Sequence, residues 1–228
     1  WGETTETGLL QRLWISCVME VKESSGVFAA NPAKRWGEQV FLANAVLFIC
    51  WFGFIVASGA YEGFNEWSYI GVGVGAILPC LTLPLLLRGT EYTNPDADLP
   101  WWEQYWVKSN VWIFIFSFIG NVHWTHYFYN LLGAQYIFDA FCINQVPIAL
   151  ILVTHAYFSF YFHGANVAIR WFSNLLPFSP SSTSFRFFNG LFIVLLSAFT
   201  ALMEALTIAS FPGYQISDRG YFYTVGSF

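Results

Sequence analysis

The chain has 228 residues, of which 56% are hydrophobic, 21% aromatic and only 10% charged. Soluble domains carry roughly 25% charged residues, so this composition excludes an ordinary soluble domain and favours a membrane protein. The net charge of -5 comes without any basic cluster. Nucleic-acid binding therefore has no support, and we expect no nucleic-acid partner.

The first 30 residues are polar and form a separate amino-terminal segment, and residues 31–228 are predicted to form one transmembrane helical domain. Hydropathy predicts five spans, each near the roughly 20 apolar residues that cross a bilayer. They cover Val40–Gly59, Tyr69–Leu87, Val111–Leu132, Val146–Val167 and Phe188–Phe211. The predicted fold is thus all-α, a polytopic membrane helix bundle.

The segments between the spans differ in composition and charge. Thr90–Trp106 and Pro177–Arg186 are rich in Pro, Ser and charge and are predicted to be loops. Basic residues precede the first span and follow the second and fourth, whereas Tyr61–Ser68 and Gly133–Gln145 carry none. The positive-inside rule therefore predicts a cytosolic amino terminus. The tail Pro212–Phe228 would then be lumenal, and its apolar end leads us to expect a sixth span beyond this chain.

Glycines and ionisable residues stand out within the spans. Gly71, Gly73 and Gly75 of the second span predict close approach of a neighbouring helix. All four histidines and one glutamate lie in the last three spans, where burying an ionisable group in hydrocarbon is costly. Helical spacing groups them into three polar stripes. The stripes are His123, His126 and Asn130; His155, Ser159, Phe162 and Asn166, with His163 at the edge; and Ser197, Thr200, Glu204 and Thr207.

Two interpretations of these stripes remain open. They can converge on one shared cavity, or they can be helix–helix contacts in which a buried histidine bonds a carbonyl and Ser or Thr joins two helices. A carboxyl group in hydrocarbon costs more to bury, so Glu204 favours a functional role. For His123, His126 and His155 function is also favoured, whereas for His163 the two interpretations are balanced. A metal site on histidine-rich membrane helices is disfavoured, because four histidines are too few ligands, and we expect no metal.

Several polar islands resemble one known family. They are N-P-A-K-R-W-G-E (Asn31–Glu38), Y-W-V-K-S-N-V-W-I-F-I-F-S-F-I-G-N (Tyr105–Asn121), W-T-H-Y-F-Y (Trp124–Tyr129), L-G-A-Q-Y (Leu132–Tyr136), N-Q-V-P (Asn144–Pro147), T-H-A-Y-F-S-F-Y (Thr154–Tyr161) and F-P-G-Y-Q-I-S-D-R (Phe211–Arg219). In these the chain resembles the plant cyclopropylsterol isomerases, the cycloeucalenol cycloisomerase family. One departure is that the family has its second histidine of the fourth span at the position of Phe162, whereas this chain has His163.

The resemblance implies an enzyme of the endoplasmic reticulum that opens the 9β,19-cyclopropane ring of cycloeucalenol and gives obtusifoliol, with a sterol from the bilayer as its partner and no cofactor. Ring opening needs an acid in a dry site, and a carboxyl group in hydrocarbon keeps its proton at neutral pH. Glu204 is the predicted acid, with Glu38 in reserve. Histidine is the predicted base or relay, through His123, His126 or His155.

A sterol has one hydroxyl group and needs one polar anchor, which Asn121, Asn130 or Lys108 can supply. Asn166, Trp124 and Tyr127 complete the predicted substrate contacts. Two other functions remain open: a sterol double-bond isomerase of another type, and a non-catalytic membrane protein that binds or transports sterols. Transporters often have broken helices and paired repeats, which this sequence lacks.

Overall fold

The computed structural model describes residues 26–87, 94–123, 127–211 and 213–224. Its long helices are α2 (Pro32–Ser58), α3 (Glu66–Leu87), α4 (Tyr105–His123), α5 (Ile148–Leu175) and α6 (Thr183–Ser210). The shorter elements are η1 (Ala60–Gly63), η2 (Trp101–Glu103), the π-helical turn η3 (Tyr127–Leu131), β1 (Ala134–Tyr136), β2 (Cys142–Ile143), β3 (Val146–Pro147), β4 (Tyr214–Ile216) and α7 (Arg219–Thr224). The structure is mostly helical, which confirms the predicted fold class.

Within the described residues, four helices are long and apolar enough to cross a membrane: α2, α3, α5 and residues 183–207 of α6. The chain is therefore a polytopic membrane protein. The third predicted span is wrong in its bounds, because α4 begins at Tyr105 and ends at His123. Its start is fixed by Asp96, whose carboxylate accepts a hydrogen bond from the Tyr105 backbone N–H at 2.7 Å. At its other end the Asn144 side chain donates to the Val122 carbonyl at 2.6 Å. Loop side chains thus satisfy backbone groups that a longer helix would have paired.

Helix α2 begins inside the Asn31–Glu38 motif, not after it as the sequence predicted. Asn31 is the N-cap, and its side-chain oxygen accepts a hydrogen bond from the Lys34 backbone N–H at 3.1 Å. Pro32 follows at the first helical position, where its missing N–H costs nothing. Gly59 ends the helix in the left-handed conformation, with φ of 66°. Helix α6 likewise starts early, because the Ser182 hydroxyl accepts from the Phe185 backbone N–H at 3.1 Å.

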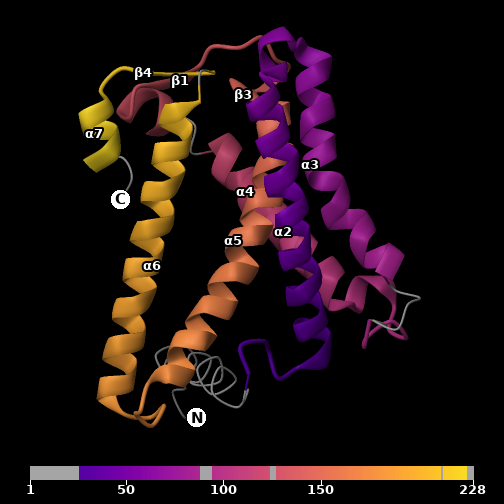
Figure 1. Ribbon diagram of the computed structural model, residues 1–228, viewed down its shortest axis with the longest axis vertical. Coiled ribbons are helices and arrows are strands. Elements are labelled where there is room, and N and C mark those ends of the chain that lie inside the picture. The colour runs from indigo at the N-terminus through magenta and orange to yellow at the C-terminus, as the bar shows by residue number, and fades with distance from the viewer. Residues whose placement is uncertain (1–25, 88–93, 124–126, 212, 225–228) are drawn as a thin grey trace, which may run out of the picture.

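Helix α5 is the centre of the bundle (Figure 1), with α2, α3 and α4 on one side and α6 on the other. The core lies between α2, α3 and α5 and consists of Phe41, Ala76, Cys80, Val153 and Ala156. The side of α5 toward α6 is far less enclosed, and only 6% of the apolar window of α6 is buried inside the protein. The bundle therefore has a packed half and an open half.

The glycines of α3 confirm the predicted close approach at two positions of three. A Cβ atom added at Gly73 would lie 3.0 Å from the Ala149 carbonyl oxygen of α5, and one at Gly75 would lie 2.9 Å from the Trp51 ring of α2. At Gly71 an added Cβ would meet nothing within 4 Å, so that part of the prediction is wrong. Two small residues thus let α3 pack against both neighbours.

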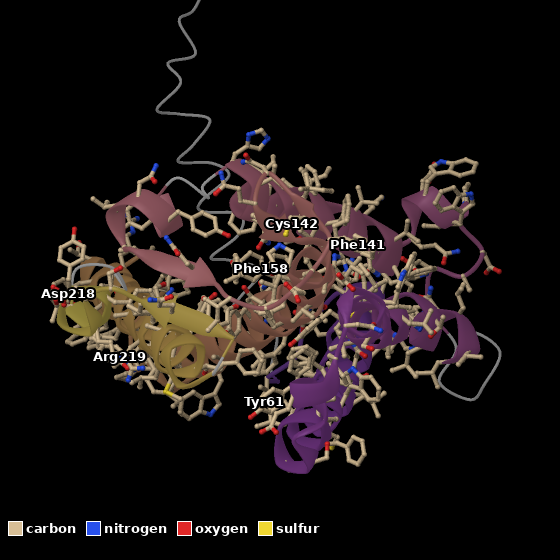
Figure 2. All side chains as sticks on the ribbon, turned by 90° about the horizontal axis from the view of Figure 1, so that it is seen from above. Tyr61, Phe141, Cys142, Phe158, Asp218 and Arg219 are labelled. Atoms are coloured by element: carbon tan, nitrogen blue, oxygen red, sulfur yellow. The ribbon has the colours of Figure 1, made fainter. Side chains whose placement is uncertain are left out.

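The two segments predicted as a lumenal loop and tail pair with each other at one end of the bundle (Figures 1 and 2). Strands β1 and β4 are antiparallel, with Gln135 opposite Gln215 and Tyr136 opposite Tyr214. Strands β2 and β3 form a second short pair, and Figure 2 shows Phe141 and Cys142 of this loop well separated from Asp218 and Arg219 at α7. The β1–β4 pair thus places Tyr136 opposite Tyr214, and Ala134 of β1 belongs to a buried cluster with Ala205 of α6.

Candidate active site

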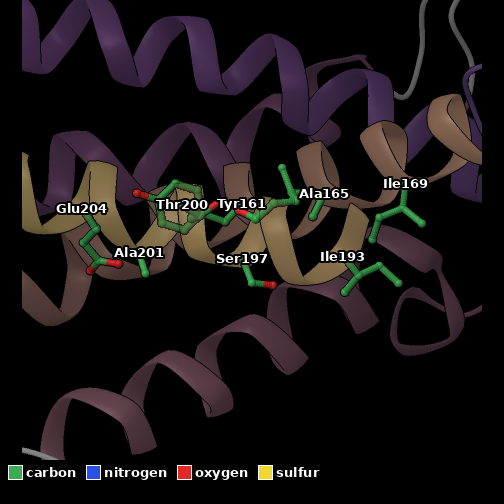
Figure 3. A pocket seen from close by; sticks show the side chains of 9 residues that line it. Tyr161, Ala165, Ile169, Ile193, Ser197, Thr200, Ala201 and Glu204 are labelled. Atoms are coloured by element: carbon green, nitrogen blue, oxygen red, sulfur yellow. Dashed lines mark hydrogen bonds between the residues drawn. The ribbon is translucent and has the colours of Figure 1, made fainter. Parts of the chain in front are cut away.

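A hollow of about 310 Å³ lies between α5 and α6. We call it the Glu204 hollow; Figure 3 shows Glu204 at one end of it and Ile169 and Ile193 at the other. It is lined by Tyr161, Ala165, Ile169, Ile193, Leu196, Ser197, Thr200, Ala201 and Glu204. The lining includes three members of the stripe predicted for the fifth span. Most of the lining is apolar, and its polar side chains are Tyr161, Ser197, Thr200 and Glu204.

The Glu204 carboxyl group is held by a tyrosine of the facing helix. The Tyr157 hydroxyl donates a hydrogen bond to Glu204 Oε1 at 3.1 Å. The same face of α5 carries Tyr161 one turn later, with its ring 5.3 Å from that of Tyr157 in an edge-to-face contact. One carboxyl oxygen is therefore oriented by Tyr157. Tyr157 and Tyr161 are thus the aromatic side chains that α5 places near the carboxyl group.

Two further tyrosines face each other in the paired strands β1 and β4. Tyr136 of β1 and Tyr214 of β4 have ring centroids 5.0 Å apart. Burial raises the pKa of both hydroxyls. Both tyrosines therefore stay protonated, as neutral hydrogen-bond donors, well above physiological pH. Burial also raises the pKa of the adjacent Tyr129 to about 12.

His155 lies on a different face of α5, in the packed half. It is 1% exposed, and its Nε2 lies 2.9 Å from Asn110 Oδ1. The Asn110 amide nitrogen donates to the carbonyls of Cys80 and Trp106, so its oxygen is the acceptor. The His155 proton is thus on Nε2, which leaves Nδ1 as a buried acceptor with no partner in the described part of the chain. His155 keeps the free nitrogen that a base needs, but it does not line the Glu204 hollow.

His163 occupies the same buried face and has both ring nitrogens in use. Nδ1 lies 2.8 Å from the Ser159 carbonyl and Nε2 lies 3.1 Å from the Ser109 hydroxyl. Its ring stacks on Phe41 with centroids 4.3 Å apart. The stripe predicted for α5 is wrong in part. His163 is fully buried, whereas Phe162 is 36% exposed. The Asn166 side chain bonds the Phe162 carbonyl of its own helix. His155, Ser159 and His163 are spaced by four residues and share the inner face.

Glu38, the reserve acid, is committed to an ion pair between α2 and α5. Both of its carboxylate oxygens accept from the Arg170 guanidinium, at 2.9 and 3.0 Å, and one also accepts from the Ala29 backbone N–H at 3.0 Å. The Glu38 side chain is 0% exposed and that of Arg170 is 3% exposed. Arg170 also donates to the Val27 carbonyl. This pair therefore joins two helices to the segment before Asn31.

The other predicted site residues do not line the Glu204 hollow. Asn121 is half-buried and accepts from Thr154 at 3.4 Å, which joins α4 to α5. Lys108, Tyr127 and Asn130 are exposed, as is His123 at the end of α4. Because α4 ends at His123 and η3 follows as a π-helical turn, the predicted face through Asn130 is not one continuous α-helix. His126 and Trp124 lie outside the described residues, so their roles stay predictions.

The polar stripes therefore do not meet in one cavity. His155 and His163 of α5 bond Asn110 and Ser109 of α4 in the packed half, and the stripe of α6 faces the Glu204 hollow. Where the structure describes it, the stripe through His123 and Asn130 is exposed. Sequence reasoning missed Tyr157 and Tyr161, although their spacing of four residues, continued by Ala165 and Ile169, predicts a common face. Within the described residues, no group of three or more His, Cys, Asp or Glu side chains is placed to hold a metal ion.

No protein-family model and no solved structure matches the chain significantly. Cycloeucalenol cycloisomerase of Arabidopsis thaliana is 38% identical to it over 200 residues, which are 87% of this chain and 69% of that protein. The chain belongs to the cycloeucalenol cycloisomerase family. This confirms the resemblance seen in the motifs, and it makes the chain an enzyme of the isomerase class. The Glu204 hollow is therefore the candidate active site of a membrane isomerase.

Proposed function

We propose that this isomerase opens the 9β,19-cyclopropane ring of a cyclopropyl sterol, as in the conversion of cycloeucalenol to obtusifoliol, by proton transfer inside the membrane. The observation that carries the proposal is a carboxyl group, Glu204, in an apolar hollow between two membrane-spanning helices. Family membership supplies the reaction class. The hollow supplies a carboxyl group that can transfer a proton within the membrane, where a sterol substrate is dissolved.

The reaction moves protons and no other atoms. The carboxylic acid of Glu204 gives its proton to the CH₂ carbon of the cyclopropane ring while one ring C–C bond breaks. That carbon becomes a methyl group, and the electron-deficient carbon left behind is a tertiary cation. A neighbouring ring carbon then loses a proton, and the electron pair of its C–H bond forms the new C=C bond. One proton enters and one leaves, so the sterol is isomerised and no redox cofactor is needed.

The surroundings of Glu204 suit each part of this reaction. An apolar site favours the neutral form of a carboxyl group, which is the form that carries a transferable proton. The Tyr157 hydroxyl bonds Oε1 and leaves Oε2 to face the substrate. The aromatic ring of Tyr161, which lines the hollow, can stabilise a cation without offering a nucleophile strong enough to trap it. The site thus combines an oriented acid with a cation-tolerant wall.

The second proton needs a base. After the first transfer Glu204 is a carboxylate, and it is the base that the described lining of the hollow offers. A histidine base stays a prediction: His126 lies outside the described residues, and His155 has its free Nδ1 on another face of α5. The sterol hydroxyl group has two candidate partners in the hollow, Ser197 and Thr200. Asn121, Asn130 and Lys108 stay predicted anchors that do not line it.

The proposal includes a location in the endoplasmic reticulum, with a cytosolic amino terminus. It rests on the basic residues before α2 and on the apolar helices that follow. A glycosylation acceptor inserted near Asp139 should be modified in microsomes, and one inserted near Ser181 should not. Ser181 is exposed in the loop between α5 and α6, so an insertion there interrupts neither helix. The opposite pattern would invert the orientation.

Membranes that contain the full-length protein provide the direct test. They are incubated with cycloeucalenol, with a ring-opened Δ8 sterol and with buffer alone, and the sterols are resolved by mass spectrometry. We expect a ring-opened product from the cyclopropyl sterol only, with one solvent deuterium in the new methyl group when the assay is run in D₂O. Conversion of the Δ8 sterol instead would identify a double-bond isomerase. Binding of both sterols without conversion would identify a non-catalytic sterol carrier.

A further inference from the structure

A second hollow, of about 420 Å³, lies between α4 and α5. We call it the α4–α5 hollow; it is lined by Trp112, Ile113 and Phe116 of α4 and by Phe158, Tyr161 and Phe162 of α5. Tyr161 lines both hollows. The two spaces therefore meet at one side chain, and an elongated ligand that passes Tyr161 would contact both linings.

The size of the first hollow shows why a ligand would extend. Ligand sites are about 300–1,000 Å³, so the Glu204 hollow is at the lower limit of this range. A cyclopropyl sterol has four fused rings and an alkyl side chain, which is more than a small site of this kind encloses. If the rings lie beside Glu204, as the proposed function requires, part of the molecule must lie elsewhere.

The chemistry of the two linings indicates which part of the sterol suits each hollow. The Glu204 hollow contains the polar side chains Ser197, Thr200 and Glu204, and so it suits the end that carries the hydroxyl group. The α4–α5 hollow has no acidic, basic or amide side chain in its lining. A hydroxyl group buried there would lose hydrogen bonds to water, whereas an alkyl chain would not. The second hollow therefore matches the alkyl side chain.

We propose that the α4–α5 hollow binds the alkyl side chain of the sterol, with Tyr161 as the specificity-determining residue at the junction. This inference rests on the proposed function. Contacts hold the junction in shape: Tyr161 lies against Tyr157 and Phe158, with ring centroids 5.3 and 6.3 Å away, and Phe158 lies 5.7 Å from Phe116. The aromatic ring of Tyr161 and not its hydroxyl group separates the rings of the substrate from its tail.

Two cyclopropyl sterols with the same rings test this, one with its alkyl side chain and one without. The variant Phe116→Ala removes a ring from the α4–α5 hollow, and its matched control is Phe54→Ala on α2. Phe116 and Phe54 are 60% and 66% exposed, and Phe54 lines neither hollow. Full-length protein in lipid nanodiscs is used for turnover and for binding of the two tritiated sterols.

We expect Phe116→Ala to raise KM and Kd for the tailed sterol by about five- to tenfold, with kcat little changed. The tail-less sterol should be bound and converted equally by Phe116→Ala, Phe54→Ala and the unmodified protein. Tyr161→Phe should keep the preference for the tailed sterol, and Tyr161→Ala should lose most of it.

Equal effects of Phe116→Ala on both sterols, or none on either, would overturn the proposal. The same holds if Phe54→Ala matches Phe116→Ala, since that would indicate a general effect of the lipid-facing surface. Failure of the proposed function has a separate signature: the unmodified protein would open neither sterol. The binding comparison would then still decide whether the tail occupies the α4–α5 hollow.

Discussion

Polar side chains have different surroundings on the two sides of α5. Toward α2, α3 and α4 they are buried and bonded to one another, as in the pair of His163 with Ser109 and the pair of Glu38 with Arg170. Toward α6, Ser173 bonds Asn189 near one end, and farther along the helices Ser197, Thr200 and Glu204 line a hollow. There Tyr157 donates the hydrogen bond to Glu204 that the described residues show. Buried polar groups in hydrocarbon are costly and need a reason. On the first side these contacts join helices, and on the second we propose that the polar groups serve a ligand and its chemistry.

The largest expected effect comes from Glu204→Gln, which keeps the size and hydrogen bonding of the side chain but removes its transferable proton. Turnover of the cyclopropyl sterol should fall about 10²–10⁴-fold, the usual contribution of general acid–base catalysis. Protein level and sterol binding should be retained. The control is Glu62→Gln in η1, an exposed carboxyl group far along the chain from the hollow. Turnover close to normal in a well-expressed Gln variant would remove Glu204 from the mechanism.

Breaking the ion pair should affect folding instead of chemistry. Glu38→Gln leaves the Arg170 charge buried with its carboxylate partner gone, which costs about 3–5 kcal/mol of stability. The melting temperature in detergent should drop strongly, while Glu66→Gln, a carboxyl at the start of α3, should have little effect. The pair-swapped variant Glu38→Arg with Arg170→Glu should recover part of the loss. Unchanged stability with lost turnover would indicate that Glu38 acts as the acid.

The two inner histidines sharpen the comparison further. His163→Ala removes two hydrogen bonds and the stack on Phe41, and His155→Ala removes the bond to Asn110. Each should cost about 1–3 kcal/mol of stability, because a buried partner is left unpaired. Turnover per folded molecule should stay near the normal value. A fall in the His155 variant as large as that of Glu204→Gln, at matched protein level, would return its free Nδ1 to the mechanism as the base.

A pair of glycine variants, one of them expected to be neutral, tests how α3 packs. Gly73→Ala places a Cβ 3.0 Å from the Ala149 carbonyl and should cost about 1–3 kcal/mol, as overpacked contacts do. Gly71→Ala makes the same change on the same helix with open space around it, and it should be neutral within about 0.5 kcal/mol. Thermal unfolding of the two variants side by side gives the answer. Equal stability would show that α3 shifts freely against α5.

The sequence by itself determined the membrane class, the positions of the long helices and the family. Hydropathy follows directly from composition along the chain, and the ordered motifs are a local property that needs no folding. It also singled out Glu204, since a carboxyl group in an apolar run is conspicuous without any knowledge of neighbours. Helix ends were less accurate, because their caps come from side chains such as Asp96 and Asn144 in loops whose positions depend on the fold.

Only the tertiary structure decided which polar groups meet. Periodicity places His155 and Glu204 each on a helix face, but it does not say which helix that face contacts. Helix α5 packs against α4 on one side and against α6 on the other. His155 therefore contacts Asn110 of α4, and Tyr157 contacts Glu204 of α6. It also pairs Glu38 with Arg170 across 132 residues of chain, a contact that no local pattern encodes. The sequence determines the chemistry of each side chain, whereas the partner of that side chain depends on how the helices pack.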